Sequence, residues 1–81
     1  MNLDSSFLEQ SRFVLDKESE ETKIKVMLIL SSYFPDDKEV DTEKAYIFIW
    51  VYKNKLWYNN FGYTRWDSFK LVDHNELLQK G

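Results

Sequence analysis

The chain contains 81 residues, of which 43% are hydrophobic and 17% aromatic, and it carries a formal net charge of −3. This length corresponds to a single domain over residues 1–81, and the hydrophobic content excludes disorder of the whole chain. The chain has no cysteine, which excludes disulfides, thiolate zinc sites and cysteine nucleophiles and favours a reducing compartment.

The N-terminal residues indicate a cytoplasmic protein. Residues 1–12 include an early acid and lack the apolar run of a secretory signal. Apolar runs such as residues 26–30 are far shorter than a membrane span. One alanine and two glycines, beside many Lys, Asn, Ile and Tyr residues, are the bias of AT-rich coding DNA and predict a bacterial or phage origin.

The first predicted element is a helix within residues 4–17. Ser6 and Glu9 have the spacing of a capping box, in which side chains satisfy the free N–H groups at a helix start. Apolar residues then follow a helical stripe through Leu15. The helix is predicted for the first half of this segment, and a competing interpretation places a short strand at residues 12–16.

The next two segments predict a loop and a strand. Residues 16–22 are polar throughout and predict a solvated loop. In residues 22–33 apolar side chains alternate and β-branched residues are common, which favours a strand over a buried helical turn. Residues 34–37 then end this strand, because Pro35 lacks the N–H group that a strand ladder needs.

A β-hairpin is predicted from residues 45–53 and 55–60. Its turn falls at Lys53-Asn54-Lys55, because Asn tolerates the left-handed conformation that such turns demand. Residues 46–52 alternate between aromatic and aliphatic side chains, so both faces of this strand would be apolar. We therefore expect a central strand with both faces covered.

The C-terminal third predicts a turn, an edge strand and a helix. The turn lies at residues 59–62, and residues 63–66 fit either a third short strand or a loop. Residues 69–72 fit an edge strand, and Asp73 and Glu76 have capping-box spacing ahead of a short C-terminal helix.

The predicted fold class is α+β. An N-terminal helix packs on a three- to four-stranded antiparallel sheet, and a short C-terminal helix follows the sheet. The alternative is a small, strongly curved β-barrel, which would bury one sheet face without help from the helix.

Acidic and basic residues are unevenly distributed. Residues 1–43 carry eleven acids and five bases, and residues 44–81 carry three acids and six bases. The acids of residues 37–41 match the first spacing of a calcium loop, but the glycine and the final glutamate of that loop are missing, so no metal is predicted. These acids form either a solvated loop that protects a sheet edge or a surface that steers a basic partner. They are Asp37, Glu39, Asp41 and Glu43.

No set of residues predicts catalysis. His74 is the only histidine, has no serine or threonine tied to it by a motif, and is predicted to lie on the surface. The carboxylate pairs lie in polar stretches, whereas acid–base catalysis needs a partly buried carboxyl group. We therefore predict a protein that is not an enzyme and that uses no cofactor.

Aromatic residues between positions 57 and 66 have bases among and beside them, at Lys53, Lys55, Arg65 and Lys70. Such residues form a core, a protein-binding patch or a platform for single-stranded nucleic acid. The net negative charge favours a protein partner over nucleic acid. The candidate contact residues are Trp57, Tyr58, Tyr63, Arg65 and Trp66.

The leading functional hypothesis is a small acidic protein-binding module that occludes a macromolecular partner, most concretely an inhibitor or immunity-type protein. Exposed rings would anchor the interface, and the acids of residues 36–43 would steer association toward a basic site. One alternative is a single-stranded nucleic-acid-binding domain that uses residues 46–70. Another is a homo-oligomer, such as a homodimer, that buries its own aromatic face.

Overall fold

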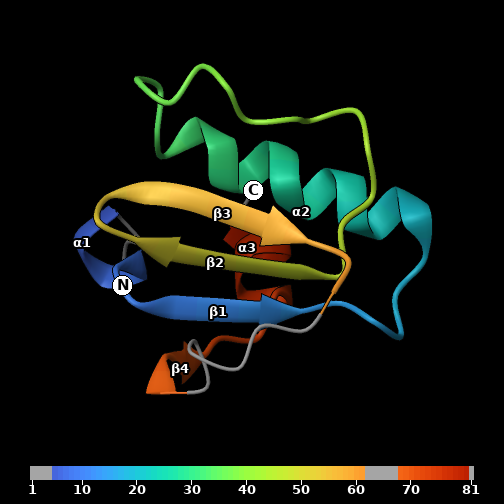
Figure 1. Cartoon of the computed structure of the whole chain (residues 1–81). Helices are drawn as coiled ribbons and strands as arrows, with labels where there is room; N and C mark the ends of the chain where they lie inside the picture. Colours follow the sequence, from blue (N-terminus) through green and yellow to red (C-terminus); the bar gives the residue numbers. More distant parts are fainter. Residues whose placement is uncertain (1–4, 62–67, 81) are drawn as a thin grey trace.

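The computed structural model describes residues 5–61 and 68–80 (Figure 1). Its elements in chain order are α1 (Ser5–Leu8), β1 (Ser11–Val14), α2 (Glu20–Ser32), β2 (Phe48–Tyr52), β3 (Lys55–Asn59), β4 (Lys70–Leu71) and α3 (Asn75–Lys80). The predicted α+β class, with helices at both ends and four strands, is confirmed. Within the described ranges, no helix is both long enough and apolar enough to cross a membrane.

The four strands form one mixed sheet in the order β3-β2-β1-β4. β2 pairs antiparallel with β1 and with β3, but β4 runs parallel to β1. The prediction of a purely antiparallel sheet is therefore wrong at this edge, because the chain reaches β4 from the opposite edge strand instead of through a hairpin. The alternative of a β-barrel is also wrong, because β3 and β4 are two open ends of the sheet.

Helices α2 and α3 lie on one face of the sheet, as Figure 1 shows. The core fills the space between these helices and the sheet, and most of its side chains are fully buried. α2 contributes Val26, Met27 and Leu30, and α3 contributes Leu77. The strands contribute Phe13, Ile49, Val51 and Leu56.

The segment predicted as a strand at residues 22–33 is helix α2, so that prediction is wrong. Ser19 caps the helix, because its side chain accepts a hydrogen bond from the Thr22 N–H group at 3.2 Å. Two acids in the first turn suit the positive end of the helix dipole. The apolar run at residues 26–30 fits the period of a helix as well as that of a strand. The helix-start signals in the polar stretch before it therefore decide the structure.

The N-terminal segment contains both elements that the sequence predicts for it. The helix is confirmed at Ser5–Leu8, and the competing strand is confirmed at Ser11–Val14. Gln10 separates them with a φ of 58°, a left-handed conformation that ends the helix. The Glu9 carboxylate accepts hydrogen bonds from the backbone N–H groups of Lys53 and Asn54 at 2.8 and 2.9 Å. Glu9 therefore clamps the hairpin turn rather than serving a helix cap.

The predicted hairpin is confirmed, since β2 and β3 pair on either side of Lys53-Asn54. These two residues have φ angles of 53° and 60°, the combination that the favoured two-residue hairpin turn requires. β2 is a central strand, as predicted. Its helix-facing side chains are fully buried, and on the other face Trp50 is 8% exposed and Tyr52 is 37% exposed. The second face is therefore covered at Trp50 and open at Tyr52.

The predicted edge strand and C-terminal helix are confirmed as β4 and α3. Asp73 accepts a hydrogen bond from the Asn75 N–H group at 2.9 Å, which supports the first turn of α3. The segment predicted as a strand or loop at residues 63–66 lies outside the described residues.

Candidate functional site

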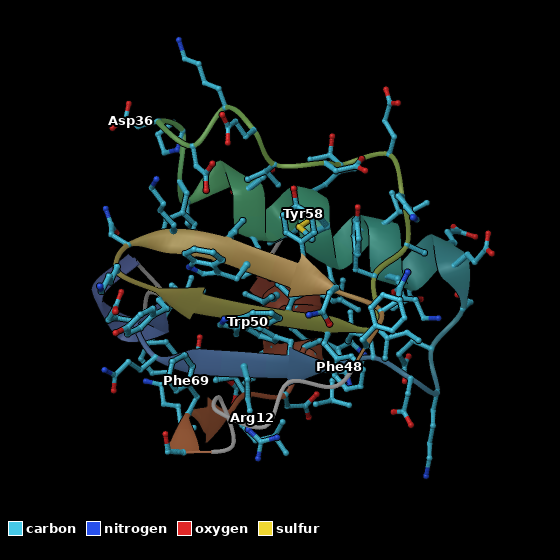
Figure 2. All side chains as sticks on the ribbon, in the orientation of Figure 1. Arg12, Asp36, Phe48, Trp50, Tyr58 and Phe69 are labelled. Carbon is cyan, nitrogen blue, oxygen red and sulfur yellow. The ribbon has the colours of Figure 1, made fainter. Side chains whose placement is uncertain are left out.

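The candidate site is the face of the sheet that lies away from α2 and α3. Residues directly opposite each other on antiparallel strands point to the same side. The register pairs Trp50 with Trp57 and Tyr52 with Lys55, so these four side chains share one face. Figure 2 shows Trp50 on the side of β2 that faces away from the helices.

Trp57 presents an exposed ring whose only polar group is already satisfied. The residue is 44% exposed, and its indole Nε1–H group donates a hydrogen bond to the Tyr52 carbonyl oxygen at 3.0 Å. Nitrogen Nε1 is the only hydrogen-bonding group of the indole, and this bond also limits the rotation of the ring. The solvent-facing part of Trp57 is therefore apolar and oriented in advance, as an interface anchor requires.

Further rings extend this surface from Trp57 toward β4. The ring centroids of Tyr52 and Phe69 are 5.7 Å apart, and Lys53 Nζ lies 5.3 Å from the centroid of Tyr52, within the range of a cation–π contact. The Nε–H group of Arg12 donates a hydrogen bond to the Phe69 carbonyl oxygen at 3.1 Å. That bond ties the segment carrying Phe69 to the middle of the sheet.

These rings line a groove of about 980 Å³, which we call the aromatic groove. Its lining includes Trp50, Tyr52, Trp57 and Phe69, together with Lys53 and Lys55. Among the described residues that line it, two are lysines and none is acidic, although the chain as a whole has a net charge of −3. The groove therefore suits a ligand that combines apolar surface with negative charge.

Tyr58 and Trp57, both predicted contact residues, point to opposite faces of β3, as neighbouring residues on a strand do. Tyr58 lies on the α2 side of the sheet (Figure 2) and packs against Tyr46 with ring centroids 4.5 Å apart. Its hydroxyl donates a hydrogen bond to the Glu39 carbonyl oxygen and accepts one from the Asp41 N–H group, both at 3.1 Å. Tyr58 therefore contacts residues 39–41 through its hydroxyl and does not share a face of β3 with Trp57.

Residues 36–44, which we call the strap, lie beside the edge strand β3. Asp37 Oδ2 accepts a hydrogen bond from the Leu56 N–H group at 3.3 Å, and Asp41 Oδ1 accepts one from the Glu43 N–H group at 2.9 Å. Asp37 and Asp41, two of the predicted contact residues, thus make hydrogen bonds within the fold. These contacts hold the strap beside β3, and the interpretation that the strap protects this sheet edge stays a prediction.

Asp41 and Tyr46 form a hydrogen-bonded pair that shifts both pKa values. The Glu43 N–H group and the Tyr46 hydroxyl, which donates to Asp41 Oδ2 at 3.0 Å, hold the pKa of Asp41 below its ordinary value of 3.8. Burial of the Tyr46 hydroxyl, followed by its bond to Asp41, raises the pKa of Tyr46 above its ordinary value of 10.0. The pair therefore favours a charged Asp41 and a neutral Tyr46.

This pair predicts how the stability of the fold depends on pH. Because the pKa of Asp41 is lowered in the folded chain, its contribution is present above its unfolded pKa and is lost as the pH falls through its folded pKa. Because the pKa of Tyr46 is raised, its contribution is lost as the pH rises beyond 10.0. Urea unfolding of Asp41→Asn should show a smaller loss of stability on acidification than the unmodified chain. Tyr46→Phe should remove part of the alkaline loss.

Glu43→Gln is the matched control for the loss of stability on acidification, because the Glu43 carboxylate accepts no hydrogen bond within the described residues. An Asp41→Asn variant that lost stability on acidification as steeply as the unmodified chain would contradict a structural role for the Asp41 carboxylate.

Asp36, Glu39 and Glu43 are the exposed acids of the strap. Glu39 and Asp37 line a second groove of about 240 Å³, which we call the acidic groove. Trp57 and Lys55 line this groove as well as the aromatic groove, so they lie between the two. Within the described part of the chain, neither Glu39 nor Lys55 forms an ion pair.

The remaining predicted residues fall in two groups. Tyr63, Arg65 and Trp66 lie outside the described residues. His74, predicted as a surface residue, has a side chain that is only 13% exposed, and its Nε2 atom lies 3.4 Å from Glu18 Oε1. The prediction for His74 is therefore wrong, because this side chain is packed between the start of α3 and the turn before α2.

Sequence reasoning missed the contributions of Phe69 and Arg12 to the site. Both residues come to the sheet face away from the helices through the pairing of β1 with β4, two strands that lie far apart in the chain. The period of two in β2 was the available signal for Trp50 and Tyr52, because it places them on one face once Ile49 and Val51 are assigned to the core.

Comparison with protein-family models, with curated proteins and with solved structures finds no match to this chain. Over the described ranges, no group of three or more His, Asp or Glu side chains is arranged to hold a metal ion. The described site offers apolar ring surface, two lysines and neighbouring carboxylates. Of these groups, the aromatic rings are the ones enriched in protein interfaces.

Proposed function

We propose that this chain is a non-enzymatic binding module, that its partner is another protein, and that the contact is centred on Trp57. The observation that supports this most directly is the exposed Trp57 ring with its indole N–H group already bonded to Tyr52. Exposed tryptophan and tyrosine residues are enriched at the energetic centres of protein interfaces. The exposed acids Glu39 and Glu43 would also speed association with a basic surface.

An inhibitor or immunity-type protein is the most concrete form of this proposal. In that role the module would cover a working surface of its partner, and no reaction on the module itself would be needed. Such a role predicts that the partner's own activity falls when the complex forms, and an unchanged activity would reduce the proposal to binding alone.

The test is a partner captured from a bacterial lysate on the immobilised chain, identified, purified and measured for affinity. Trp57→Ala is expected to weaken this affinity about 30-fold, or roughly 2 kcal/mol, because truncation of a central aromatic residue removes its buried contacts. Isothermal calorimetry measures the affinity, and circular dichroism checks that the variant is folded.

Leu28→Ala is the matched control, because Leu28 is a 51% exposed apolar residue on the opposite layer of the molecule. It is expected to leave the affinity unchanged. Trp57→Phe keeps a ring, so its affinity for the partner should lie between those of Trp57→Ala and Leu28→Ala. A folded Trp57→Ala variant with full affinity would contradict the proposal.

The described lining of the aromatic groove contains lysines and no acid, which favours a second candidate, the binding of single-stranded nucleic acid. Bases would stack on Trp57 and Tyr52, and phosphates would meet Lys53 and Lys55. Titration with short oligonucleotides at low salt, followed by tryptophan fluorescence, tests this candidate. Binding with a steep dependence on salt would support it, and no binding at low salt would exclude it. Sedimentation of the chain alone at monomer mass would exclude the homodimer.

A further inference from the structure

The aromatic groove and the acidic groove differ in charge and meet at one ridge. Lys53 and Lys55 belong to the aromatic groove, whose described lining has no acid, and Glu39 belongs to the acidic groove. Trp57, Lys55 and Tyr58 line both. A ligand that crosses β3 over Trp57 therefore passes from a groove whose described charged residues are lysines to one that also contains Asp37 and Glu39.

The charged side chains on the two sides of this ridge form no ion pairs within the described residues. No carboxylate pairs with Lys53 or Lys55 there, and the Glu39 carboxylate accepts no hydrogen bond. Asp37, by contrast, has one oxygen bonded to the Leu56 N–H group. Lys55 and Glu39 line the same acidic groove without meeting, so each is available to a charge of the opposite sign.

We infer that the partner protein presents a bipolar segment, with carboxylates on one side of an apolar or aromatic residue and basic groups on the other. The apolar residue rests on Trp57, the carboxylates face Lys53 and Lys55, and the basic groups face Glu39. This inference rests on the proposed function and specifies the chemistry of the partner at that same site.

The acidic groove is the reason for choosing a peptide over a nucleic-acid strand. A single strand is negative along its whole length, so phosphates that leave the aromatic groove over β3 would meet Glu39 and the Asp37 carboxylate. Like charges placed together at an interface oppose binding. A peptide is able to change the sign of its charge over a few residues, and a strand of nucleic acid is not.

The experiment uses the whole chain and blocked synthetic peptides at millimolar concentration. The bipolar peptide is Asp-Asp-Gly-Phe-Gly-Lys-Lys. In three further peptides all four charged residues are replaced by Asp, by Lys or by Ser. A short oligothymidylate is the nucleic-acid probe. The shift of the Trp57 indole N–H resonance reports binding. The bipolar peptide is expected to bind about three- to tenfold more tightly than the Ser peptide, as two exposed ion pairs allow.

Two charge reversals locate the contacts. Lys55→Glu and Glu39→Lys should each abolish the preference for the bipolar peptide, whereas Lys25→Glu, at an exposed position on α2, should leave it intact. Tighter binding of the all-Asp peptide or of the oligothymidylate would overturn the inference, and so would the absence of binding by the bipolar peptide.

Equal binding of the bipolar and Ser peptides would also overturn the inference, but it would leave Trp57 as an apolar anchor. The proposed function itself fails only if the purified partner binds Trp57→Ala at full affinity. The two failures are therefore distinguishable.

Discussion

Leu30→Ala is expected to lower the free energy of unfolding by about 2–5 kcal/mol, whereas Leu28→Ala is expected to lower it by less than about 1 kcal/mol. Both residues lie on α2, but Leu30 is fully buried and Leu28 is 51% exposed. The two substitutions remove the same atoms from the same helix, so the difference between them measures burial. Urea unfolding followed by circular dichroism gives both values.

The same pair of variants distinguishes the helix from the strand that the sequence predicts. A strand places Leu28 and Leu30 on one face, because its side chains alternate with a period of two, and the two losses would then be similar. In α2 the two residues point in different directions, toward solvent and toward the core. Equal losses of stability would contradict the helix.

Tyr58→Ala is expected to lower the free energy of unfolding by about 2–4 kcal/mol, because a half-buried ring and both hydrogen bonds to the strap are lost together. Tyr58→Phe keeps the ring contact with Tyr46 and loses only the hydroxyl, so it should cost about 1–2 kcal/mol. In both variants the Leu56 amide, bonded to Asp37 of the strap, should exchange with solvent faster than in the unmodified chain.

Tyr33→Phe is the matched control for the hydroxyl. Tyr33 is a half-buried tyrosine at the end of α2, and its hydroxyl makes no hydrogen bond within the described residues. Removal of the Tyr33 hydroxyl should change the free energy of unfolding by less than about 0.5 kcal/mol. If Tyr58→Phe behaved like Tyr33→Phe, and amide exchange at Leu56 were unchanged, the strap would not be held by the Tyr58 hydroxyl.

Local chemistry explains which elements the sequence predicts correctly. The hairpin follows from Asn54 and from the alternation in β2, and α3 follows from the acids at its start, since all of these signals lie within a few residues of the element. The error at α2 has a local cause too. An apolar run of five residues fits the period of a helix and that of a strand, and the polar stretch before it, which predicts a loop, contains the capping residue Ser19.

The other differences between prediction and structure depend on contacts that are distant in the chain. The parallel pairing of β4 with β1, the Glu9 clamp on the hairpin turn and the Tyr58 contact with the strap join segments that no sequence window contains together. The candidate site depends on the same contacts. Trp57 could be identified as a candidate from its residue type, but its separation from Tyr58 requires the register of β3.

The central position of β1 has a consequence for the order in which the protein assembles on the ribosome. Arg12 pairs with Trp50 on one side and with Leu71 on the other, so β1 emerges long before either neighbouring strand has been synthesised. The hairpin of β2 and β3 needs only local contacts and is able to form as soon as it emerges. β1 must then join that hairpin from a distance, and β4 completes the sheet last. A ribosome that stalled before residue 70 would therefore leave β1 as an uncovered edge on which another nascent chain could pair.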